Sequence, residues 1–460
     1  VFLNSVKNKK IKRRTYLSKA QNETDIQYKQ RVLDPLSSSF CGAKWYNATI
    51  WLGSGMTTSC HHPLPHKIDA DAVKINPKLL HNTPEKKEQR RQMQCGERPS
   101  GCEYCWKIED MGTKFISDRV YKSKIYTTEE LENAFRTDYR EDINLRTLEI
   151  AFDRTCNFAC SYCNPAFSST WVKDLKTHGA YENLKSDGRN HFTHTHDSNQ
   201  LYKYGETNPY VEAFFAWWDT DLHRTLRELR ITGGEPIMSA ELWRLFDWFK
   251  LNADKSQTKL AINSNLGGKP ELIDKLVECR THLPSLDVYS SMEATGYSAE
   301  YIRDGLDFEQ WWKNLIKLHY ASIDTHCMMT INALCLPTLP DMIEKILNSR
   351  NLFGESFATM SYNILRFPSF QSCLVLPQPI KDECVSRLKQ LDLSNMQEWE
   401  QGQLDRLIEY LQVVEKPHNE AFEMPRLHND FKKFYTQYDV RRNHTFARAF
   451  PELEEWYESL

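Results

Sequence analysis

Three cysteines within a short stretch constrain this chain more than any other feature. Cys156, Cys160 and Cys163 stand in AFDRTCNFACSYCNPAF, residues 151–167, with the spacing C-x3-C-x2-C. Three thiolates at this spacing can hold three corners of a 4Fe–4S cube and leave the fourth iron without a protein ligand. A structural zinc ion usually takes four protein ligands, and the ten residues after Cys163 contain no Cys or His. The stretch therefore predicts an iron–sulfur cluster with one open iron, which can bind a substrate or cofactor.

The segments around this loop read as alternating strands and helices. LRTLEIAFD, residues 145–153, has the period-two pattern of a strand, and the cysteines follow at its C-terminal end. LRELRIT, residues 226–232, is a second such strand and runs into the turn Gly233-Gly234-Glu235-Pro236. Apolar residues at helical spacing follow over residues 240–250. Because ligands bind at the carboxyl ends of strands in α/β sheets, both turns are candidate site segments.

Further strands end in polar side chains. KLAINSNLGG, residues 259–268, LDVYSSME, residues 286–293, and HCMMTINALC, residues 326–335, are read as strands. Amide and hydroxyl groups suit ribose, and an arginine can pair bidentately with a carboxylate, although each group could equally be an ordinary strand-end side chain. These polar residues are Asn263, Ser264, Asn265, Ser291, Glu293 and, on a following segment, Arg303. Strands alternating with helices predict a partial (β/α)6 barrel over residues 145 to about 365.

The cysteine motif, with Tyr162 before its third cysteine, resembles the signature of the radical S-adenosylmethionine (SAM) superfamily, and the turn at residues 233–236 resembles that family's GGEP motif. The resemblance implies that the open iron binds SAM, which the reduced cluster cleaves to methionine and a 5′-deoxyadenosyl radical that abstracts hydrogen from a substrate. Relatives usually carry Asp at the position of Glu293. The resemblance implies catalytic and metal-binding roles for Cys156, Cys160 and Cys163, and cofactor binding by Tyr162, Gly233, Gly234, Glu235, Asn263, Asn265, Ser291, Glu293 and Arg303.

A second set of cysteines precedes the first. A C-x2-C pair after two distant single cysteines is a plausible four-thiolate set, and a neighbouring fifth cysteine could replace one member. His61 and His62 could ligate zinc instead, so a 4Fe–4S cluster, zinc and no metal all stay open. The predicted metal ligands are Cys41, Cys60, Cys102 and Cys105, with Cys95 as the alternative.

The sequence around these cysteines resembles the twitch-domain branch of radical SAM proteins, and this resemblance implies one auxiliary 4Fe–4S cluster. The resemblance lies in GERPSGCEYCWKIEDMGTKFISDR at 96–119, YIRDGLDFEQWWKNL at 301–315 and YDVRRNHTFARAFPELEEW at 438–456. Relatives often show paired cysteines where this chain has Cys60 and His61, so the ligand set stays open there.

These patterns predict an α/β protein with four segments. The segments are a basic N-terminal tail at 1–39, an auxiliary-cluster (twitch-like) domain at 40–125, the partial barrel at 145–365 and a helical C-terminal region at 366–460. Eight of the thirteen cysteines lie before residue 164, and such bunching indicates metal binding in a reducing compartment, so we expect a cytoplasmic protein. No run of about 20 apolar residues exists, so no membrane partner is expected.

The leading hypothesis is a radical SAM enzyme whose auxiliary 4Fe–4S cluster assists electron transfer. Its substrate is a peptide, a protein or a small molecule, its electron donor is a flavodoxin or ferredoxin, and its reaction could be that of an oxidoreductase, epimerase or transferase. A non-catalytic iron–sulfur electron carrier or regulatory protein is the alternative, which explains the cysteines but not the GGEP turn, Ser291 or Arg303. A zinc-stabilised nucleic-acid-binding protein is disfavoured by the net charge of −3 but stays open because of the basic tail.

Overall fold

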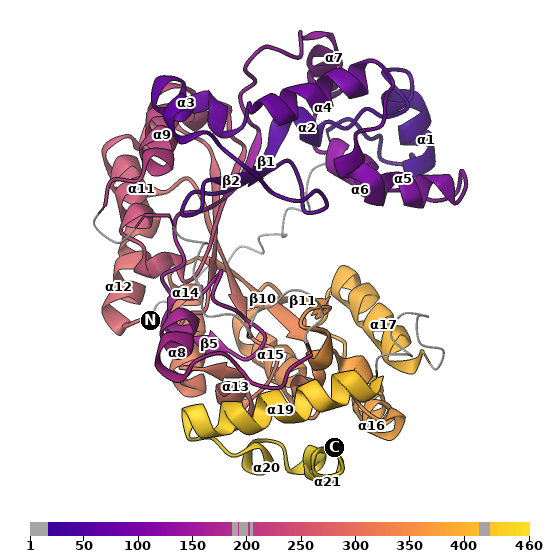
Figure 1. Ribbon diagram of the computed structural model, residues 1–460, viewed down its shortest axis with the longest axis vertical. Helices are drawn as coiled ribbons and strands as arrows, with labels where there is room; N and C mark the ends of the chain where they lie inside the picture. Colours follow the sequence, from indigo (N-terminus) through magenta and orange to yellow (C-terminus); the bar gives the residue numbers. More distant parts are fainter. Residues whose placement is uncertain (1–16, 186–191, 193–200, 203–205, 414–423) are drawn as a thin grey trace. The chain divides into compact units, whose positions relative to one another are not determined.

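The computed structural model describes residues 17–185, 192, 201–202, 206–413 and 424–460. The chain is a mixed α/β protein with two compact units, each built from separate stretches of sequence (Figure 1). Unit 1 comprises the described residues of Val1–Asp153, Asn199–Thr232 and Leu251–Leu260, and unit 2 those of Arg154–Ser198, Gly233–Lys250 and Ala261–Leu460. The first sixteen residues of the predicted basic tail lie outside the described residues.

Unit 1 combines short helices with strands in the order β3-β2-β1-β4-β6. β1 is parallel to β4 and β4 is parallel to β6, whereas β2 is antiparallel to both of its neighbours. Its strands are β1 (Asn47–Trp51), β2 (Met56–Thr58), β3 (His66–Lys67), β4 (Thr147–Ala151) and β6 (Glu228–Thr232). Its helices are α1 (Asp25–Tyr28), α2 (Ala43–Tyr46), α3 (Ala70–Ile75), α4 (Pro84–Gln94), α5 (Glu103–Asp110), α6 (Asp118–Ser123), α7 (Thr128–Arg136), α9 (Pro209–Trp217) and α10 (His223–Thr225).

The helices of unit 1 enclose a core that includes cysteines. Trp45 and Met93 are fully buried in one apolar cluster that also contains Cys41, Cys102 and Cys105. The helix α7 begins with a capping box, in which the Thr127 side chain accepts from the Glu130 N–H and the Glu130 side chain accepts from the Thr127 N–H. Burial in this cluster fixes the backbone that carries three of the early cysteines.

Unit 2 contains most of β7 (Lys259–Ser264). Its strands are hydrogen-bonded in the order β7-β8-β10-β11. β10 is parallel to both β8 and β11, and the short strands β5 and β9 form a separate antiparallel pair. The other strands are β5 (Ala159–Cys160), β8 (Leu286–Ser291), β9 (Arg303–Asp304), β10 (Asp324–Ile331) and β11 (Thr359–Ile364). The helices between them are α8 (Ser169–His178), α11 (Ala240–Leu251), α12 (Pro270–Cys279), α13 (Gly296–Ile302), α14 (Phe308–Tyr320) and α15 (Leu339–Phe353).

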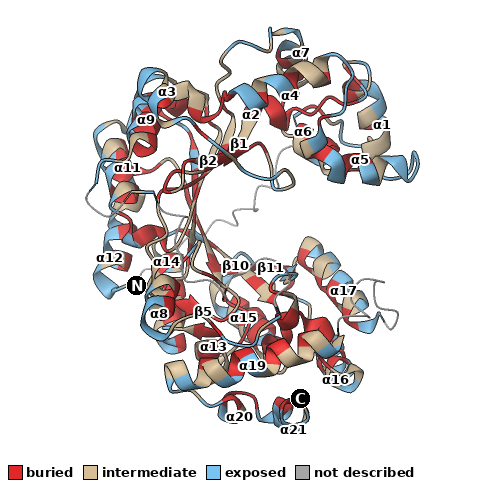
Figure 2. Ribbon diagram, in the orientation of Figure 1, coloured by how far each residue is buried: buried red, intermediate tan, exposed pale blue. Residues whose placement is uncertain are grey.

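The predicted strands and helices of this region are confirmed. In β10, Cys327, Met329 and Ile331 are fully buried and alternate with half-buried residues, as the two faces of a strand require. The helix expected after the GGEP turn is α11, and its apolar residues face the core. The buried residues that were predicted for it are Leu242, Leu245, Phe246 and Phe249. Figure 2 shows the buried strands and the exposed outer turns of helices such as α12 and α17.

The C-terminal part of unit 2 is helical. Its helices are α16 (Gln378–Lys389), α17 (Glu398–Gln412), α19 (Met424–Arg442), α20 (Phe446–Ala449) and α21 (Glu454–Glu458). Arg350 and Glu400, both fully buried in their side chains, form an ion pair 2.8 Å long that ties α17 to α15. Across the described residues, every helix is too short or too polar to cross a bilayer.

Candidate functional site

The three-cysteine loop follows β4 and includes the short strand β5. In the antiparallel pair of β5 and β9, Cys160 lies directly opposite Arg303. The Cys163 N–H donates to the Cys160 carbonyl at 2.9 Å, which turns the chain between the last two cysteines. The Cys156 N–H donates to the Ser169 hydroxyl at 3.0 Å, at the start of α8. The loop is therefore fixed at all three cysteines by contacts within unit 2.

The three sulfurs interact electrostatically. Burial raises the pKa of Cys156 to about 12, and the charge of Cys160 raises it further. Burial is also the main cause that raises the pKa of Cys163, followed by the charges of Cys160 and Cys156. Because thiols must lose their protons to bind metal, these groups need a cation among them to ionise at neutral pH. The charges of these thiols therefore disfavour one another, and binding to a positively charged metal centre would relieve that repulsion.

Polar N–H groups point at the sulfurs. The backbone N–H of Phe158 donates to Cys156 Sγ at 3.5 Å, and Asn265 Nδ2 lies 3.9 Å from the same sulfur. Arg303 Nη1 lies 3.8 Å from Cys160 Sγ. Hydrogen bonds to sulfur stabilise thiolates and tune the potential of iron–sulfur clusters. The surroundings of the loop are therefore built for sulfur atoms that carry negative charge.

The GGEP turn is bonded directly to the cysteine loop. The Glu235 N–H donates to the Thr155 carbonyl, one residue before Cys156, at 2.6 Å. A Cβ atom at Gly234 would lie 2.3 Å from the same carbonyl oxygen, so only glycine permits this approach. Gly233 has a φ of 125°, in the region that favours glycine. The two motifs that the sequence singled out separately form one substructure.

The Glu235 carboxylate is buried and accepts hydrogen bonds from neighbouring groups. Its oxygens accept from the Ser264 hydroxyl at 2.8 Å, from the Asn265 N–H at 2.5 Å and from the Ile237 N–H at 3.2 Å. Burial raises the pKa of Glu235 to about 7, because its effect exceeds that of the three donors. Glu235 thus fixes the end of β7, and the adjacent backbone of Gly233 and Gly234 is what the turn can offer to a ligand.

Arg303, Glu293 and Tyr162 form a buried group beside Cys160. Glu293 is 1% exposed and accepts from Arg303 Nη2 at 2.5 Å and from the Tyr162 hydroxyl at 3.0 Å. The Arg303 guanidinium lies over the Tyr162 ring, 5.4 Å from its centroid. Arg303 Nε is buried and finds no hydrogen-bond partner within the described part of the chain. A buried N–H without an acceptor is costly, and an anionic ligand at this point would satisfy it.

The remaining residues predicted to bind a cofactor lie at strand ends. Asn265 follows β7, and its Nδ2 donates to the Asn157 side chain at 2.9 Å, inside the cysteine loop. Asn263 is half-buried within β7, and Ser291 is half-buried at the end of β8. Asn157 was missed by sequence reasoning, although its place beside Cys156 was a local signal. Hydrogen bonds within unit 2 bring five of the predicted residues together with the cysteines, namely Tyr162, Glu235, Asn265, Glu293 and Arg303.

The helix α19 also contacts the loop, which sequence reasoning did not foresee. The Tyr438 hydroxyl lies 3.3 Å from the Ala159 carbonyl and 3.0 Å from the Tyr301 carbonyl. The Arg442 guanidinium lies over the Trp171 ring at 4.6 Å, and Trp171 Nε1 donates to the Cys160 carbonyl at 3.0 Å. The contacts of Tyr438 with Ala159 and of Arg442 with Trp171 join residues more than 260 positions apart. They give a physical role to the C-terminal stretch at 438–456.

The early cysteines meet in unit 1. Four of them line one small cavity, together with Lys44 and Arg119. The four are Cys41, Cys60, Cys102 and Cys105. Cys95 is exposed at the end of α4, where its sulfur lies 3.8 Å from Arg91 Nη1. The cavity thus contains the four cysteines that sequence spacing favoured and not the spare one.

Burial dominates the chemistry of these four thiols. It raises the pKa of Cys41 to about 12, and the charges of Cys102, Cys60 and Cys105 raise it further. His62, an alternative zinc ligand, has its Nε2 2.8 Å from the Asp118 carboxylate and stacks on the Tyr104 ring at 3.9 Å. In the described residues, no group of three or more His, Cys, Asp or Glu side chains is arranged to hold one metal ion. Cysteines of a cube each bind a different iron, so their sulfurs need not converge on one point.

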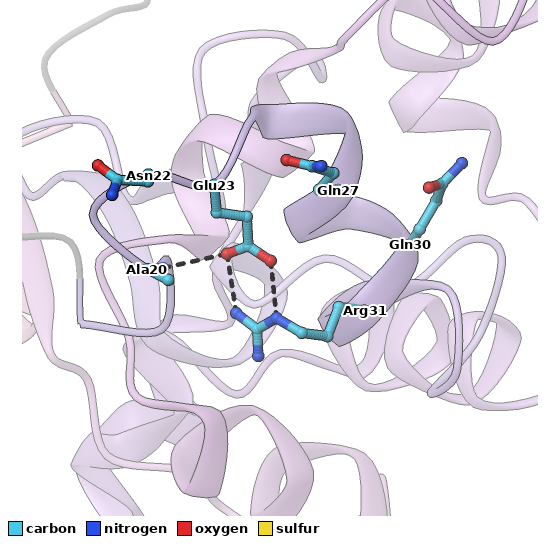
Figure 3. A pocket seen from close by; sticks show the side chains of 6 residues that line it. All are labelled: Ala20, Asn22, Glu23, Gln27, Gln30 and Arg31. Atoms are coloured by element: carbon cyan, nitrogen blue, oxygen red, sulfur yellow. Dashed lines mark hydrogen bonds and ion pairs between the residues drawn. The ribbon is translucent and has the colours of Figure 1, made fainter.

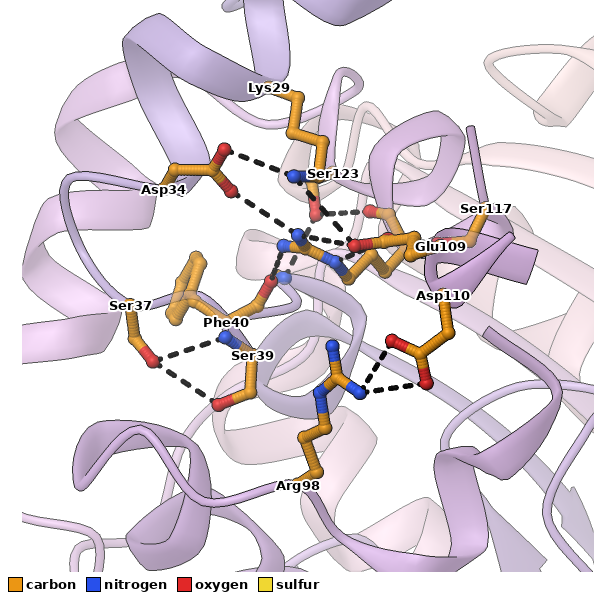
Figure 4. Close-up of polar contacts among 12 residues, drawn as sticks. Lys29, Asp34, Ser37, Ser39, Phe40, Arg98, Glu109, Asp110, Ser117 and Ser123 are labelled. Carbon is orange, nitrogen blue, oxygen red and sulfur yellow. Dashed lines mark hydrogen bonds and ion pairs between the residues drawn. The ribbon is translucent and has the colours of Figure 1, made fainter. Parts of the chain in front are cut away.

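Arg119 holds one wall of this cavity through a polar network. Its guanidinium pairs with Glu109, at 2.7 Å from Nε, and with Asp34, at 3.3 Å from Nη2. Figure 4 shows the carboxylates of Asp34 and Glu109 in this network. Its Nη1 donates to the Phe40 carbonyl at 2.9 Å, directly before Cys41. This arginine is therefore fully compensated and fixes the backbone that carries Cys41.

A shallow hollow elsewhere in unit 1 has no such chemistry. It is lined by Ala20, Asn22, Glu23, Gln27, Gln30 and Arg31 (Figure 3). Arg31 donates to both oxygens of Glu23, at 2.7 and 2.8 Å, and to the Ser18 carbonyl at 2.9 Å. Its charges satisfy each other, so the hollow is a surface feature.

Comparisons with known proteins find only distant structural similarity. No protein-family model matches the chain, and no curated protein matches it. A solved structure of anSMEcpe with bound AdoMet is 13% identical and covers 53% of this chain and 59% of that one, with a TM-score of 0.32. Streptococcus suis SuiB bound to the precursor peptide SuiA is 11% identical, covers 75% of this chain and 69% of that one, and has a TM-score of 0.35. SuiB bound to S-adenosylmethionine is 11% identical, covers 74% and 68%, and has a TM-score of 0.32.

The chain spans about 59% of the length of anSMEcpe, the first of these structures. At these TM-scores, only a small part of the backbone superposes on each of these structures. The assignment of function therefore rests on the residues of the two cysteine sites themselves.

Proposed function

We propose that this chain is a radical SAM enzyme that uses Cys156, Cys160 and Cys163 to hold a 4Fe–4S cluster with one iron open to SAM. One observation carries the proposal: the GGEP turn is bonded to the cysteine loop through the Glu235 N–H and the Thr155 carbonyl, 2.6 Å apart. A non-catalytic iron–sulfur carrier needs the cysteines but has no use for a glycine turn at this place. A bound cluster supplies the electron that splits SAM into methionine and a 5′-deoxyadenosyl radical.

The residues around the loop have distinct roles in this proposal. Arg303 would bind the SAM carboxylate, because its Nε is buried without an acceptor among the described residues and its charge lies opposite Cys160. The backbone of Gly233 and Gly234 would receive the SAM ammonium group. Glu293 holds Arg303 and Tyr162 in place from a buried position.

The barrel, the auxiliary cluster and the wider function belong to the same proposal. We propose that the alternating strands and helices from β4 to β11 form a partial (β/α)6 barrel. Cys41, Cys60, Cys102 and Cys105 would hold an auxiliary 4Fe–4S cluster in a twitch-like domain, and that cluster would pass electrons to or from the substrate. A flavodoxin or ferredoxin would reduce the enzyme in the cytoplasm. The segments at 1–39, 40–125, 145–365 and 366–460 remain the proposed divisions of the chain.

The structural neighbours suggest a substrate class. SuiB is named with a bound precursor peptide. A peptide or protein is therefore the first substrate class to test, ahead of small molecules. The test is a screen of deuterated peptides for transfer of deuterium from the peptide into 5′-deoxyadenosine.

The direct test is SAM cleavage after anaerobic reconstitution with iron and sulfide. The wild type, reduced with dithionite, is expected to form 5′-deoxyadenosine, and Cys160→Ala is expected to form none because the cube loses a corner. Cys279→Ala is the matched control, since Cys279 is an isolated half-buried cysteine on α12. Cleavage that persists in Cys160→Ala, or is absent from the wild type at full iron loading, would refute the proposal.

A further inference from the structure

A buried lysine lies against the four-cysteine cavity of unit 1. Lys44, on α2, is 2% exposed and lines the cavity together with the four thiols. Its Nζ donates to the Gln89 side-chain oxygen. Within the described residues, no carboxylate forms an ion pair with it. A buried ammonium group whose oxygen partner is a neutral amide is costly unless negative charge lies nearby.

The two other cations of the cavity differ from Lys44. Arg119 lines the same cavity and is paired with two carboxylates. Lys122 also lines it but is half-buried, so water can screen its charge. Lys44 is therefore the buried cation of this cavity that has no carboxylate partner within the described residues.

A second buried lysine of unit 1 has different partners. Lys86 is fully buried, and its Nζ donates to the Thr57 hydroxyl at 2.7 Å and the Thr58 carbonyl at 3.2 Å and lies 3.3 Å from His81 Nδ1. It does not line the cavity. Oxygen atoms of β2 thus hold Lys86, whereas Lys44 has the Gln89 oxygen and lies in the wall of the four-thiol cavity.

We infer that Lys44 is the counter-cation of the auxiliary cluster and raises its reduction potential. The inference rests on the auxiliary cluster of the proposed function. Four thiolates give a bound 4Fe–4S cluster a net negative charge, which increases when the cluster is reduced. A fixed positive charge in a buried cavity stabilises the more negative, reduced form, so it raises the potential. Lys44 thereby makes this cluster a better electron acceptor.

The test isolates the auxiliary cluster. In a variant with Cys156, Cys160 and Cys163 all changed to Ala, the iron that remains after reconstitution belongs to unit 1. In that background, Lys44→Gln removes the charge while keeping a polar side chain, and Lys44→Arg keeps the charge. The midpoint potential is measured by redox titration followed by electron paramagnetic resonance, with iron and sulfide counted for each variant. Lys44→Gln is expected to lower the potential, and Lys44→Arg to leave it near the parent value.

The control is Lys107→Gln, because Lys107 lies on the same helix as Cys105 but its side chain is 73% exposed and screened by water. An equal potential in Lys44→Gln and its parent, at equal iron content, would overturn the inference. Loss of iron from Lys44→Gln but not from Lys44→Arg, with an unchanged circular dichroism spectrum, would support the counter-cation role. If the parent variant, with Cys156, Cys160 and Cys163 changed to Ala, binds no iron, then the auxiliary cluster does not form and this inference is wrong. SAM cleavage by the wild type tests the main proposal separately.

Discussion

The two cysteine sites use the same ligand atom in different surroundings. In unit 2, three thiols share a loop with N–H donors and with a guanidinium that has an unsatisfied buried nitrogen. In unit 1, four thiols line a small cavity, and three cations, Lys44, Arg119 and Lys122, also line it. The first site has one ligand too few to close a cube, and the second has enough.

Under the proposed function, this difference would separate SAM cleavage at one site from electron transfer at the other. An open iron is useful only if neighbouring groups can orient what binds there, and the first site provides Arg303 and the Gly233–Gly234 backbone. A cluster held by four thiolates would need its charge balanced, and Lys44 is the group proposed to do so. In this proposal, both the number of thiolates and the side chains around them would set the iron chemistry of each site.

The largest expected effect separates the two sites by iron content. Cys102→Ala should lower iron by about four atoms per chain and leave SAM cleavage measurable at the other site, because each 4Fe–4S cluster contributes four irons. Cys95→Ala is the control and should keep all iron, since Cys95 is exposed and does not line the cavity. Iron and sulfide analysis of the reconstituted proteins measures the iron content per chain. The ligand set would be wrong if Cys95→Ala lost iron and Cys102→Ala did not.

The second prediction concerns Arg303, the side chain proposed to bind the SAM carboxylate at the three-cysteine site. Arg303→Gln should weaken SAM binding about tenfold to a hundredfold, because a hydrogen bond to a charged partner contributes roughly 1.5–3 kcal/mol. Equilibrium dialysis on the reconstituted enzyme measures this dissociation constant. Arg280→Gln, a change at a surface arginine in the same unit, should leave it unchanged. Equal SAM affinity in wild type and Arg303→Gln would show that the unsatisfied Nε is not a ligand group.

The third prediction uses the raised pKa of Glu235, which lies at about 7. A carboxyl whose folded pKa exceeds its unfolded value adds stability below the unfolded pKa, and this is lost as pH rises through the folded value. Between pH 5.5 and pH 8 the unloaded wild type should therefore lose roughly 2 kcal/mol of unfolding free energy relative to Glu235→Gln. Urea unfolding of both proteins at the two pH values measures the difference. A constant difference would mean that Glu235 is not protonated in the folded protein.

The smallest effect tests the contact between α19 and the cysteine loop. Tyr438→Phe removes a buried hydroxyl that lies within hydrogen-bond distance of the Ala159 and Tyr301 carbonyls, so the free energy of unfolding should fall by about 1 kcal/mol. Tyr320→Phe, at a tyrosine that is 75% exposed, is the matched control. Thermal unfolding monitored by circular dichroism compares the two. Equal stability of the two variants would show that the Tyr438 hydroxyl does not hold the loop.

Much of this arrangement could be predicted from the sequence because its signals are local. The cysteine spacing, the GGEP turn and the alternation of strands each lie within a few residues, and period-two and helical patterns place them at strand ends. The partner of Glu293 could not be predicted, because Arg303 reaches it only after β9 pairs with β5. Lys44 carried no signal, and Tyr438, although it begins the resembling stretch at 438–456, carried none for its contact with the cysteine loop. Their roles depend on burial and on contacts far apart in sequence, which no local pattern encodes.

The measurement that tests the central claim most directly is the electron paramagnetic resonance spectrum of the reduced protein before and after addition of SAM. It is recorded on Cys102→Ala, which should retain only the three-cysteine cluster, and on Cys160→Ala, which should retain only the auxiliary one. We predict that SAM changes the signal of Cys102→Ala, because an open iron gains a ligand, and leaves that of Cys160→Ala unchanged. A SAM-dependent change in Cys160→Ala, or none in Cys102→Ala, would contradict the account.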